Sequence, residues 1–318
     1  MKLYLKTIWK LTSFVAVLLV LLMISSLIFQ PKGNKASDGI LDPVANGILG
    51  EPENTIDVLI VGDSEAYSAF IPLKIWKDKG ITSYVCATPA QKLFYSLEFV
   101  EKTFRTQKPK IVFLETNALF RATTYVDGVA QKFEDKLTVF RYHNRWKTLK
   151  LRDFSFGTDV TGTELNKGYR FSNAIVPADS TDHMKKSSLP EKISNQNKLQ
   201  IEAIKKLCDE NGAKLVLIST PSTINWNKLR HDRTEAYSKE LGVEYIDLNY
   251  DKSINIDWSK DTKDKGDHLN HNGALKVTEF LGGYLASTGL FTDKRSNTSY
   301  SDWFDAVEQF TKGTGNPL

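Results

Sequence analysis

The first thirty residues carry the longest apolar segment of the chain. Positions 11–31 hold no charged residue, and positions 14–29 are almost wholly apolar, which is about the length that crosses a bilayer as a helix. Lys2, Lys6 and Lys10 precede this segment. The positive-inside rule therefore predicts a cytoplasmic N-terminus, with the chain beyond Lys32 on the outer side.

A cleaved signal peptide is the alternative for this segment. Its apolar core is long for a signal peptide, and no clear small-x-small cleavage site precedes Gln30. We therefore expect an uncleaved anchor over residues 1-31, in a single-pass protein of the bacterial cytoplasmic membrane. Residues 32-54 hold Gly, Pro, Asn and Asp without periodicity, which predicts a juxtamembrane linker.

Beyond the linker, short apolar runs alternate with amphipathic stretches. The runs predict strands at 57–61, 83–86, 110–115, 213–219 and 243–248, and the stretches predict helices at 67–79, 93–104, 198–211, 231–241 and 271–285. This alternation predicts an α/β fold, a three-layer sandwich around a five-stranded parallel sheet with right-handed crossovers. The alternation is interrupted at about 121-196. We interpret this stretch as an insertion within a single domain that spans 55-318.

Composition excludes some functions. The chain has 318 residues, of which 41% are hydrophobic and 25% charged, enough for one sizeable α/β domain with an anchor and an insertion. The net charge of +4 is small, and no basic run is interleaved with aromatic residues, which argues against nucleic-acid binding. The two cysteines, Cys86 and Cys208, fall in a predicted strand and a predicted helix, where we expect buried free thiols.

Gly62-Asp63-Ser64 follows the first predicted strand and enters a helical pattern. Open α/β sheets bind their ligands beyond the carboxyl ends of the strands, so Ser64 stands where a nucleophile would be expected. Serine needs a histidine base and an orienting acid, and 264–270 (Asp-Lys-Gly-Asp-His-Leu-Asn) supplies both. The alternative is an ordinary turn in which Asp63 or Ser64 caps the helix.

These blocks resemble the SGNH, or GDSL-type, hydrolase superfamily. The resemblance rests on Gly62-Asp63-Ser64, a second block with Gln91, a third with Asn117, and a final Asp…His268-Leu-Asn. The nearer likeness is to the membrane-anchored DltD- and AlgJ-like proteins of cell-envelope acylation. It implies a flavodoxin-like SGNH fold without cofactor, in which Ser64 is the nucleophile and His268 the base.

The acid is less clearly indicated. Of His143, His183, His231, His268 and His271, only His268 has acids close before it in the loop that enters the last helix. The family's usual acid position, three residues before the histidine, is Lys265 here. Asp264 is favoured over the adjacent Asp267, because a looped spacing of three or four can bring a carboxylate under the imidazole.

The resemblance also suggests an oxyanion hole. Asn117 follows the third strand, where the family has its oxyanion asparagine, and a backbone N–H near Ala87 stands where the family usually has glycine. The alternative for Asn117 is a turn residue. Gln91 is either a polar residue of the site or the start of a helix.

Substrate-binding candidates combine aromatic with basic or amide groups. They are His143 and Trp146 in the 142–147 stretch, the 167–170 stretch, and Trp226 between two asparagines. Such loops suit a polyhydroxylated or anionic glycan, and the alternative for Trp146 is packing on the core. Asp261, Asp264, Asp267, His268 and His271 also resemble a metal cluster, but they lack a fixed ligand spacing, and we expect no metal.

These patterns predict serine-dependent O-acyl transfer to, or deacylation of, a cell-envelope glycan. The expected acceptor is such a glycan or a teichoic-acid-like polymer, and the expected protein partner is a membrane-bound O-acyltransferase. The alternative is a non-catalytic accessory or scaffold of that acyltransferase system.

Overall fold

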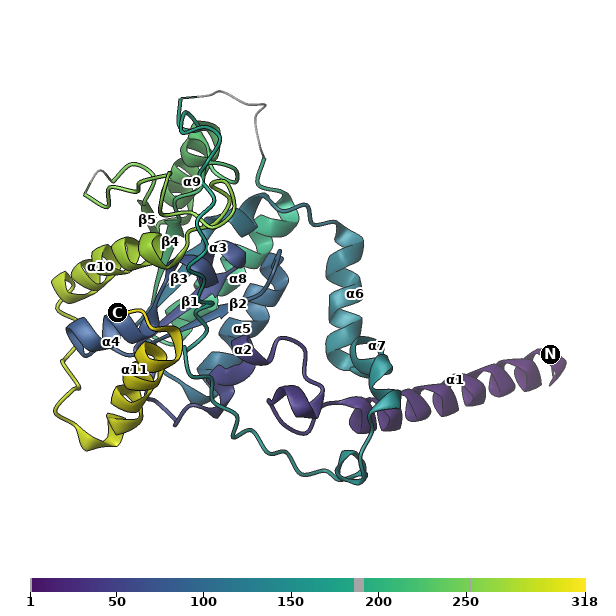
Figure 1. The fold of residues 1–318 in the computed structure, drawn as a ribbon. Coiled ribbons are helices and arrows are strands. Elements are labelled where there is room, and N and C mark those ends of the chain that lie inside the picture. The colour runs from purple at the N-terminus through teal and green to yellow at the C-terminus, as the bar shows by residue number, and fades with distance from the viewer. Residues whose placement is uncertain (1, 186–191, 252) are drawn as a thin grey trace. The chain divides into compact units, whose positions relative to one another are not determined.

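The computed structural model describes residues 2–185, 192–251 and 253–318 (Figure 1). The chain forms two compact units. The helical unit comprises Met1–Pro43 and Thr124–Thr161, and the α/β unit comprises Val44–Thr123 and Gly162–Leu318. The region expected as one insertion at about 121-196 is therefore divided between the units, and its residues 186–191 lie outside the described part.

The helical unit contains α1 (Lys2–Phe29), α6 (Tyr125–Lys136) and α7 (Val139–Tyr142). Within α1, Tyr4–Phe29 reaches a mean hydropathy of 2.7 over an 18-residue window and is long and apolar enough to cross a membrane, a property that signal sequences share. The carboxyl end of α1 is held within the unit, because Arg145 donates to the Phe29 carbonyl at 2.5 Å and to Asp153 at 2.7 Å.

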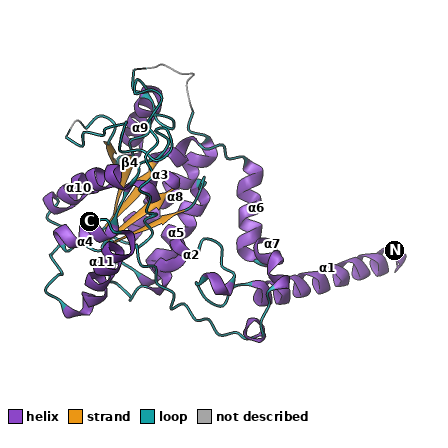
Figure 2. Cartoon of the chain, in the orientation of Figure 1, coloured by secondary structure: helices purple, strands orange, loops and turns teal. Residues whose placement is uncertain are grey.

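The α/β unit is built on one parallel sheet, which confirms the predicted fold class (Figure 2). Its strands are β1 (Val58–Gly62), β2 (Ser83–Ala87), β3 (Ile111–Glu115), β4 (Lys214–Ser219) and β5 (Glu244–Asp247). Their order is β2-β1-β3-β4-β5, and each neighbouring pair is parallel. The carboxyl ends of all five strands therefore lie along the same edge.

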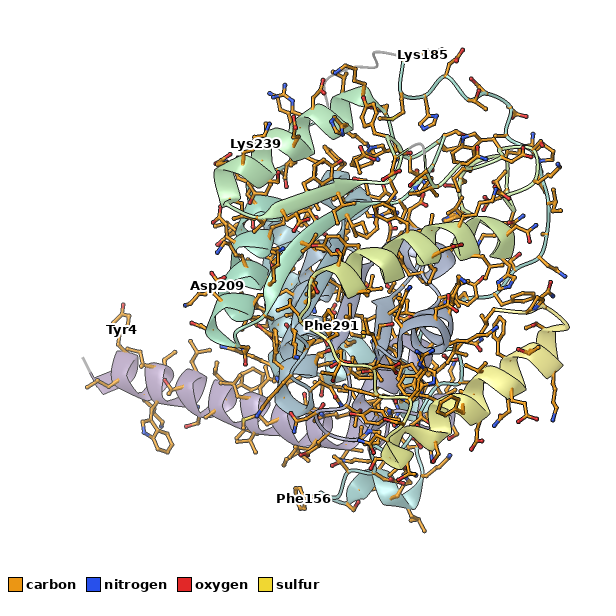
Figure 3. The ribbon with its side chains drawn as sticks, turned by 90° about the vertical axis from the view of Figure 1, so that its left-hand side faces the viewer. Tyr4, Phe156, Lys185, Asp209, Lys239 and Phe291 are labelled. Atoms are coloured by element: carbon orange, nitrogen blue, oxygen red, sulfur yellow. The ribbon has the colours of Figure 1, made fainter. Side chains whose placement is uncertain are left out.

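Helices cover both faces of this sheet. They are α2 (Pro43–Asn46, beginning at the unit boundary), α3 (Ser64–Ala69), α4 (Pro72–Lys79), α5 (Leu93–Thr106), α8 (Asn195–Glu210), α9 (Lys228–Leu241), α10 (His271–Ser287) and α11 (Ser301–Thr314). Polar side chains such as Asp209 and Lys239 lie on the outer surface of α8 and α9 (Figure 3).

Alternate strand residues pack into two separate cores. Leu59 and Val61 of β1 share one core with residues of α5, α8 and α11, whereas Val58 and Ile60 share the other with residues of α3, α4 and α10. Side chains alternate between the faces of a strand, so a strand buried on both sides must be apolar at every position. This is why β1 appears in the sequence as an unbroken apolar run.

Three details differ from the sequence-based expectation. The helix expected at 67–79 is two helices, because Pro72 cannot continue α3 and instead occupies the first turn of α4. The linker expected at 32-54 is folded at its end, where Ala45 and Ile48 are buried in a core. The C-terminal helix α11 was not expected, and it buries Trp303 and Phe310.

Candidate active site

Ser64 lies just beyond the carboxyl end of β1, the strand between β2 and β3, and is the first residue of α3. Asp63 accepts a hydrogen bond from the Glu65 backbone N–H at 3.0 Å. Of the two residues considered as a helix cap, Asp63 therefore has this role. Gly62 is required here, since a Cβ would come within 2.5 Å of the Glu115 Cβ. Ser64 remains partly exposed, and its side chain lies near that of Tyr67.

His268 lies in the loop before α10, and its Nδ1 is 2.7 Å from Asp264 Oδ2. The other oxygen of Asp264 accepts the His268 backbone N–H at 2.6 Å, so one carboxylate holds both the ring and the backbone of the histidine. The Asp267 carboxylate is 3.6 Å from Nδ1. Of the two candidate acids, Asp264 has the hydrogen-bonding geometry of an orienting acid.

The backbone conformation explains how Asp264 reaches the His268 ring from four residues earlier in the chain. Lys265 and Gly266 both have positive φ, 64° and 90°, so the chain turns tightly between Asp264 and His268. A Cβ at position 266 would lie 2.0 Å from the Thr223 hydroxyl, so this turn requires glycine. Asp267 lies farther from Nδ1, and Asn225 donates a hydrogen bond to it.

The second ring nitrogen of His268, Nε2, is buried and has no hydrogen-bond partner in the described part of the chain. It therefore does not contact the Ser64 hydroxyl in this structure, and catalytic hydrogen bonds in ligand-free sites are often long. The start of α3 is nevertheless at this loop: polar atoms of Glu65, Asp267 and His268 lie within 4.8 Å of one another. Nε2 is the nitrogen that a serine base uses.

Asn117 follows β3 and is oriented through three hydrogen bonds. Its backbone N–H donates to Glu115 at 2.9 Å, its side-chain Nδ2 donates to Asp63 at 3.0 Å, and its Oδ1 accepts from Arg230 at 2.8 Å. An amide nitrogen carries two hydrogens, so the bond to Asp63 leaves one N–H for a ligand. Ala87 ends β2 in register with Gly62, so both predicted oxyanion donors lie at the sheet edge that carries Ser64.

Buried carboxyl groups surround this edge, a feature that the sequence analysis missed. Burial and the nearby Asp63 raise the pKa of both Glu65 and Glu115 well above the usual range. Glu65 accepts hydrogen bonds from Asn225 at 2.7 Å and Thr220 at 3.4 Å. The positively charged partner of these carboxyl groups is Arg121, whose Nε donates to Asp63 at 2.8 Å.

Three residues at this edge could also ligate a metal ion. Glu65, Asp267 and His268 converge closely enough to do so. Burial raises the pKa of Glu65, so protons compete with a metal ion for its carboxylate. Asp261 pairs with Lys276 at 2.5 Å and His271 bonds to Tyr169 at 3.1 Å, so these two residues of the cluster suggested by the sequence have other partners.

Two of the predicted substrate-binding residues are buried in the α/β unit. Gln91 donates to Ser96 at 2.9 Å and holds the turn after β2. Trp226 is 2% exposed, and its ring N–H donates to Asp247 at 2.9 Å, so it packs in the structure and presents no face for stacking on a sugar.

His143 and Trp146 belong to the helical unit, whereas Ser64 and His268 belong to the α/β unit. Trp146 is 63% exposed, and Lys147 lies over its ring, so it does not have the core-packing role that the sequence left open. A contribution of these two residues to substrate binding stays a prediction.

The extended segment after Gly162 supports the loop that carries His268. The Val176 backbone donates to Thr262 at 3.0 Å and accepts from Lys265 at 3.0 Å, and the His271 N–H donates to Ser172 at 2.7 Å. Farther back, Val85 of β2 donates to Lys167 at 2.9 Å. This part of the expected insertion thus extends from the edge strand to the histidine loop.

No model of a known protein family matches the chain, and no curated protein matches it in sequence. Solved structures of esterases, lipases and acylhydrolases, among them a GDSL-like lipase, are similar to it. They include the esterase EstA from Pseudoalteromonas sp. (10% identity, TM-score 0.39, covering 73% of this chain and 97% of that one). A GDSL-like lipase from Bacteroides thetaiotaomicron is 14% identical with a TM-score of 0.37, and the match covers 73% of this chain and 88% of that one. A lipase/acylhydrolase from Enterococcus faecalis is 13% identical with a TM-score of 0.36, and the match covers 73% of this chain and 95% of that one. Because these identities and TM-scores are low, only the geometry of this chain supports the roles of its site residues.

Proposed function

We propose that this protein cleaves esters through a serine nucleophile. Ser64 attacks the acyl carbon, His268 Nε2 takes the hydroxyl proton and returns it to the leaving alcohol, and Asp264 orients the imidazole. The free N–H of Asn117, with a backbone N–H near Ala87, receives the developing negative charge, and such donors typically contribute about 3 kcal/mol each. The observation that carries the proposal is His268, which Asp264 holds through Nδ1 and which lies close to Glu65 at the start of α3, while its Nε2 has no hydrogen-bond partner among the described residues.

A fluorophosphonate probe tests this proposal directly. The probe forms a covalent bond only with an activated serine, so we expect labelling of one peptide, that containing Ser64, as read by mass spectrometry. Ser64→Ala and His268→Ala should each remove the label. An intact, folded chain that takes up no probe would instead support the non-catalytic scaffold.

We further propose that the acyl group is transferred to a glycan of the cell envelope. The support is the resemblance to DltD- and AlgJ-like proteins and the apolar α1 preceded by lysines. Transfer and hydrolysis share the formation of the acyl-enzyme and differ in whether a sugar hydroxyl or water attacks it. In this proposal a membrane-bound O-acyltransferase supplies the acyl group.

The topology on which this depends can be measured by thiol labelling. A cysteine introduced at Lys35 should react in intact cells with a reagent that cannot cross membranes, whereas one introduced at Lys6 should not. The unmodified chain is a suitable control, because Cys86 and Cys208 are both buried free thiols, as expected from the sequence. Labelling confined to position 6 would contradict an envelope substrate.

A further inference from the structure

Two cations lie over the ring of Tyr67, the residue whose side chain lies near that of Ser64. The guanidinium carbon of Arg170 is 4.3 Å from the ring centroid, and Lys263 Nζ is 5.9 Å from it. Tyr67 is three residues after Ser64 in α3, so the two side chains share one face of the helix. Arg170 comes from the segment that supports the histidine loop, and Lys263 directly precedes Asp264.

Neither cation has an ion-pair partner within 4.0 Å among the described residues. Lys263 Nζ donates to the Ser68 hydroxyl at 2.9 Å, and Arg170 Nε is buried without any hydrogen-bond partner in the described chain. Asp264, Glu65 and Asp267 act on Lys263 only through space. By contrast, the buried Lys167 is paired with Glu51 at 2.8 Å.

This arrangement is costly for a protein without a ligand. Partly buried cations lose hydration, and burial is the largest cause of the lowered pKa of Lys263, to which Arg170 adds a smaller repulsion. Asp264, Glu65 and Asp267 oppose this effect at Lys263, and stacking on Tyr67 stabilises both cations, but neither supplies a hydrogen-bond acceptor to Arg170 Nε. An anion that binds both groups would satisfy Arg170 Nε and offset the repulsion.

We propose that Arg170 and Lys263 form a subsite beside Ser64 that binds an oxyanion group, phosphate or carboxylate, of the substrate. Such a group forms short, charge-assisted hydrogen bonds with a guanidinium and an ammonium arriving from two different segments. The subsite deepens the proposed function and rests on it for the identity of the reacting ester. It makes the substrate an ester that carries negative charge close to its acyl group.

Binding can be tested without catalysis. Calorimetry with the full-length protein should detect glycerol phosphate or glycerate, and should not detect glycerol at the same concentration. Arg170→Gln and Lys263→Gln should each weaken anion binding roughly ten-fold, the effect of one charged hydrogen bond. Arg233→Gln removes an exposed arginine of α9 and should change nothing.

Two controls show that weaker binding does not come from misfolding: the melting temperature of each variant and the variant Arg170→Lys. That variant keeps the charge but loses the guanidinium fork, and it should bind the anion better than Arg170→Gln. The subsite is overturned if the wild-type protein binds neither anion, or if Arg233→Gln weakens binding as much as Arg170→Gln does.

A kinetic comparison separates this inference from the proposed function. Wild-type protein should cleave the acetyl ester of glycerol phosphate or of glycerate with a higher kcat/KM than that of glycerol, and the ratio should fall towards one in Arg170→Gln and Lys263→Gln, mainly through KM. If the protein cleaves charged and neutral esters equally well, the subsite is overturned and the proposed function stands. Anion binding without cleavage of any ester overturns the proposed function and leaves the subsite standing.

Discussion

Replacing Ser64 with alanine is expected to lower the turnover of an activated acetyl ester by at least about ten-thousand-fold. The covalent step needs the hydroxyl, and no other group at the site replaces it: the side chain of Asp63 is buried among its partners Asn117 and Arg121. The expected loss is larger than that from removing an oxyanion donor. The measurement is kcat/KM with a chromogenic acetyl ester.

The control for this variant is Ser287→Ala, which removes an exposed hydroxyl near the end of α10. Both variants should keep the melting temperature of the wild-type protein, because Ser64 is partly exposed, Ser287 is exposed, and neither hydroxyl lies in a core. Undiminished hydrolysis by a folded Ser64→Ala variant would show that Ser64 is not the nucleophile.

Asp264→Asn is expected to cost about ten-thousand-fold in rate, and Asp267→Asn much less. Asparagine at 264 can still accept the His268 backbone N–H, so the loop should remain folded. Its amide no longer favours the tautomer with the proton on Nδ1, and Nε2 then cannot act as the base. Asp267 is 3.6 Å from Nδ1 and has Asn225 as its own partner.

This pair of variants is internally matched, since both change one carboxylate to an amide in the same loop and both side chains are 38% exposed. The rates of both variants would be measured with the same ester and at the same pH. If Asp267→Asn lost more activity than Asp264→Asn, the orienting role would pass to Asp267.

Several features of the fold could be predicted because they depend on nearby residues. The run 58–61 in β1 and the run 111–114 in β3 are apolar at every position, since both faces of a parallel sheet are buried, and this pattern is visible in a single sequence. Pro72 could have indicated the break between α3 and α4, because proline cannot continue a helix. The helix α11 was harder to recognise: it is separated from the last strand by α10, and its Trp303 is buried by packing on Trp76, far away in the chain.

The sequence by itself determined the parallel α/β architecture, the apolar α1 and the placement of Ser64 at the end of β1, because strand alternation, apolar length and turn chemistry are local properties. Only the tertiary structure decided which aspartate lies under His268, through the left-handed turn at Lys265 and Gly266. It also decided that Trp226 and Gln91 are buried and that Arg170 and Lys263 both lie over the Tyr67 ring. Those outcomes depend on tertiary packing or on backbone angles, and neither leaves a pattern in the order of residues.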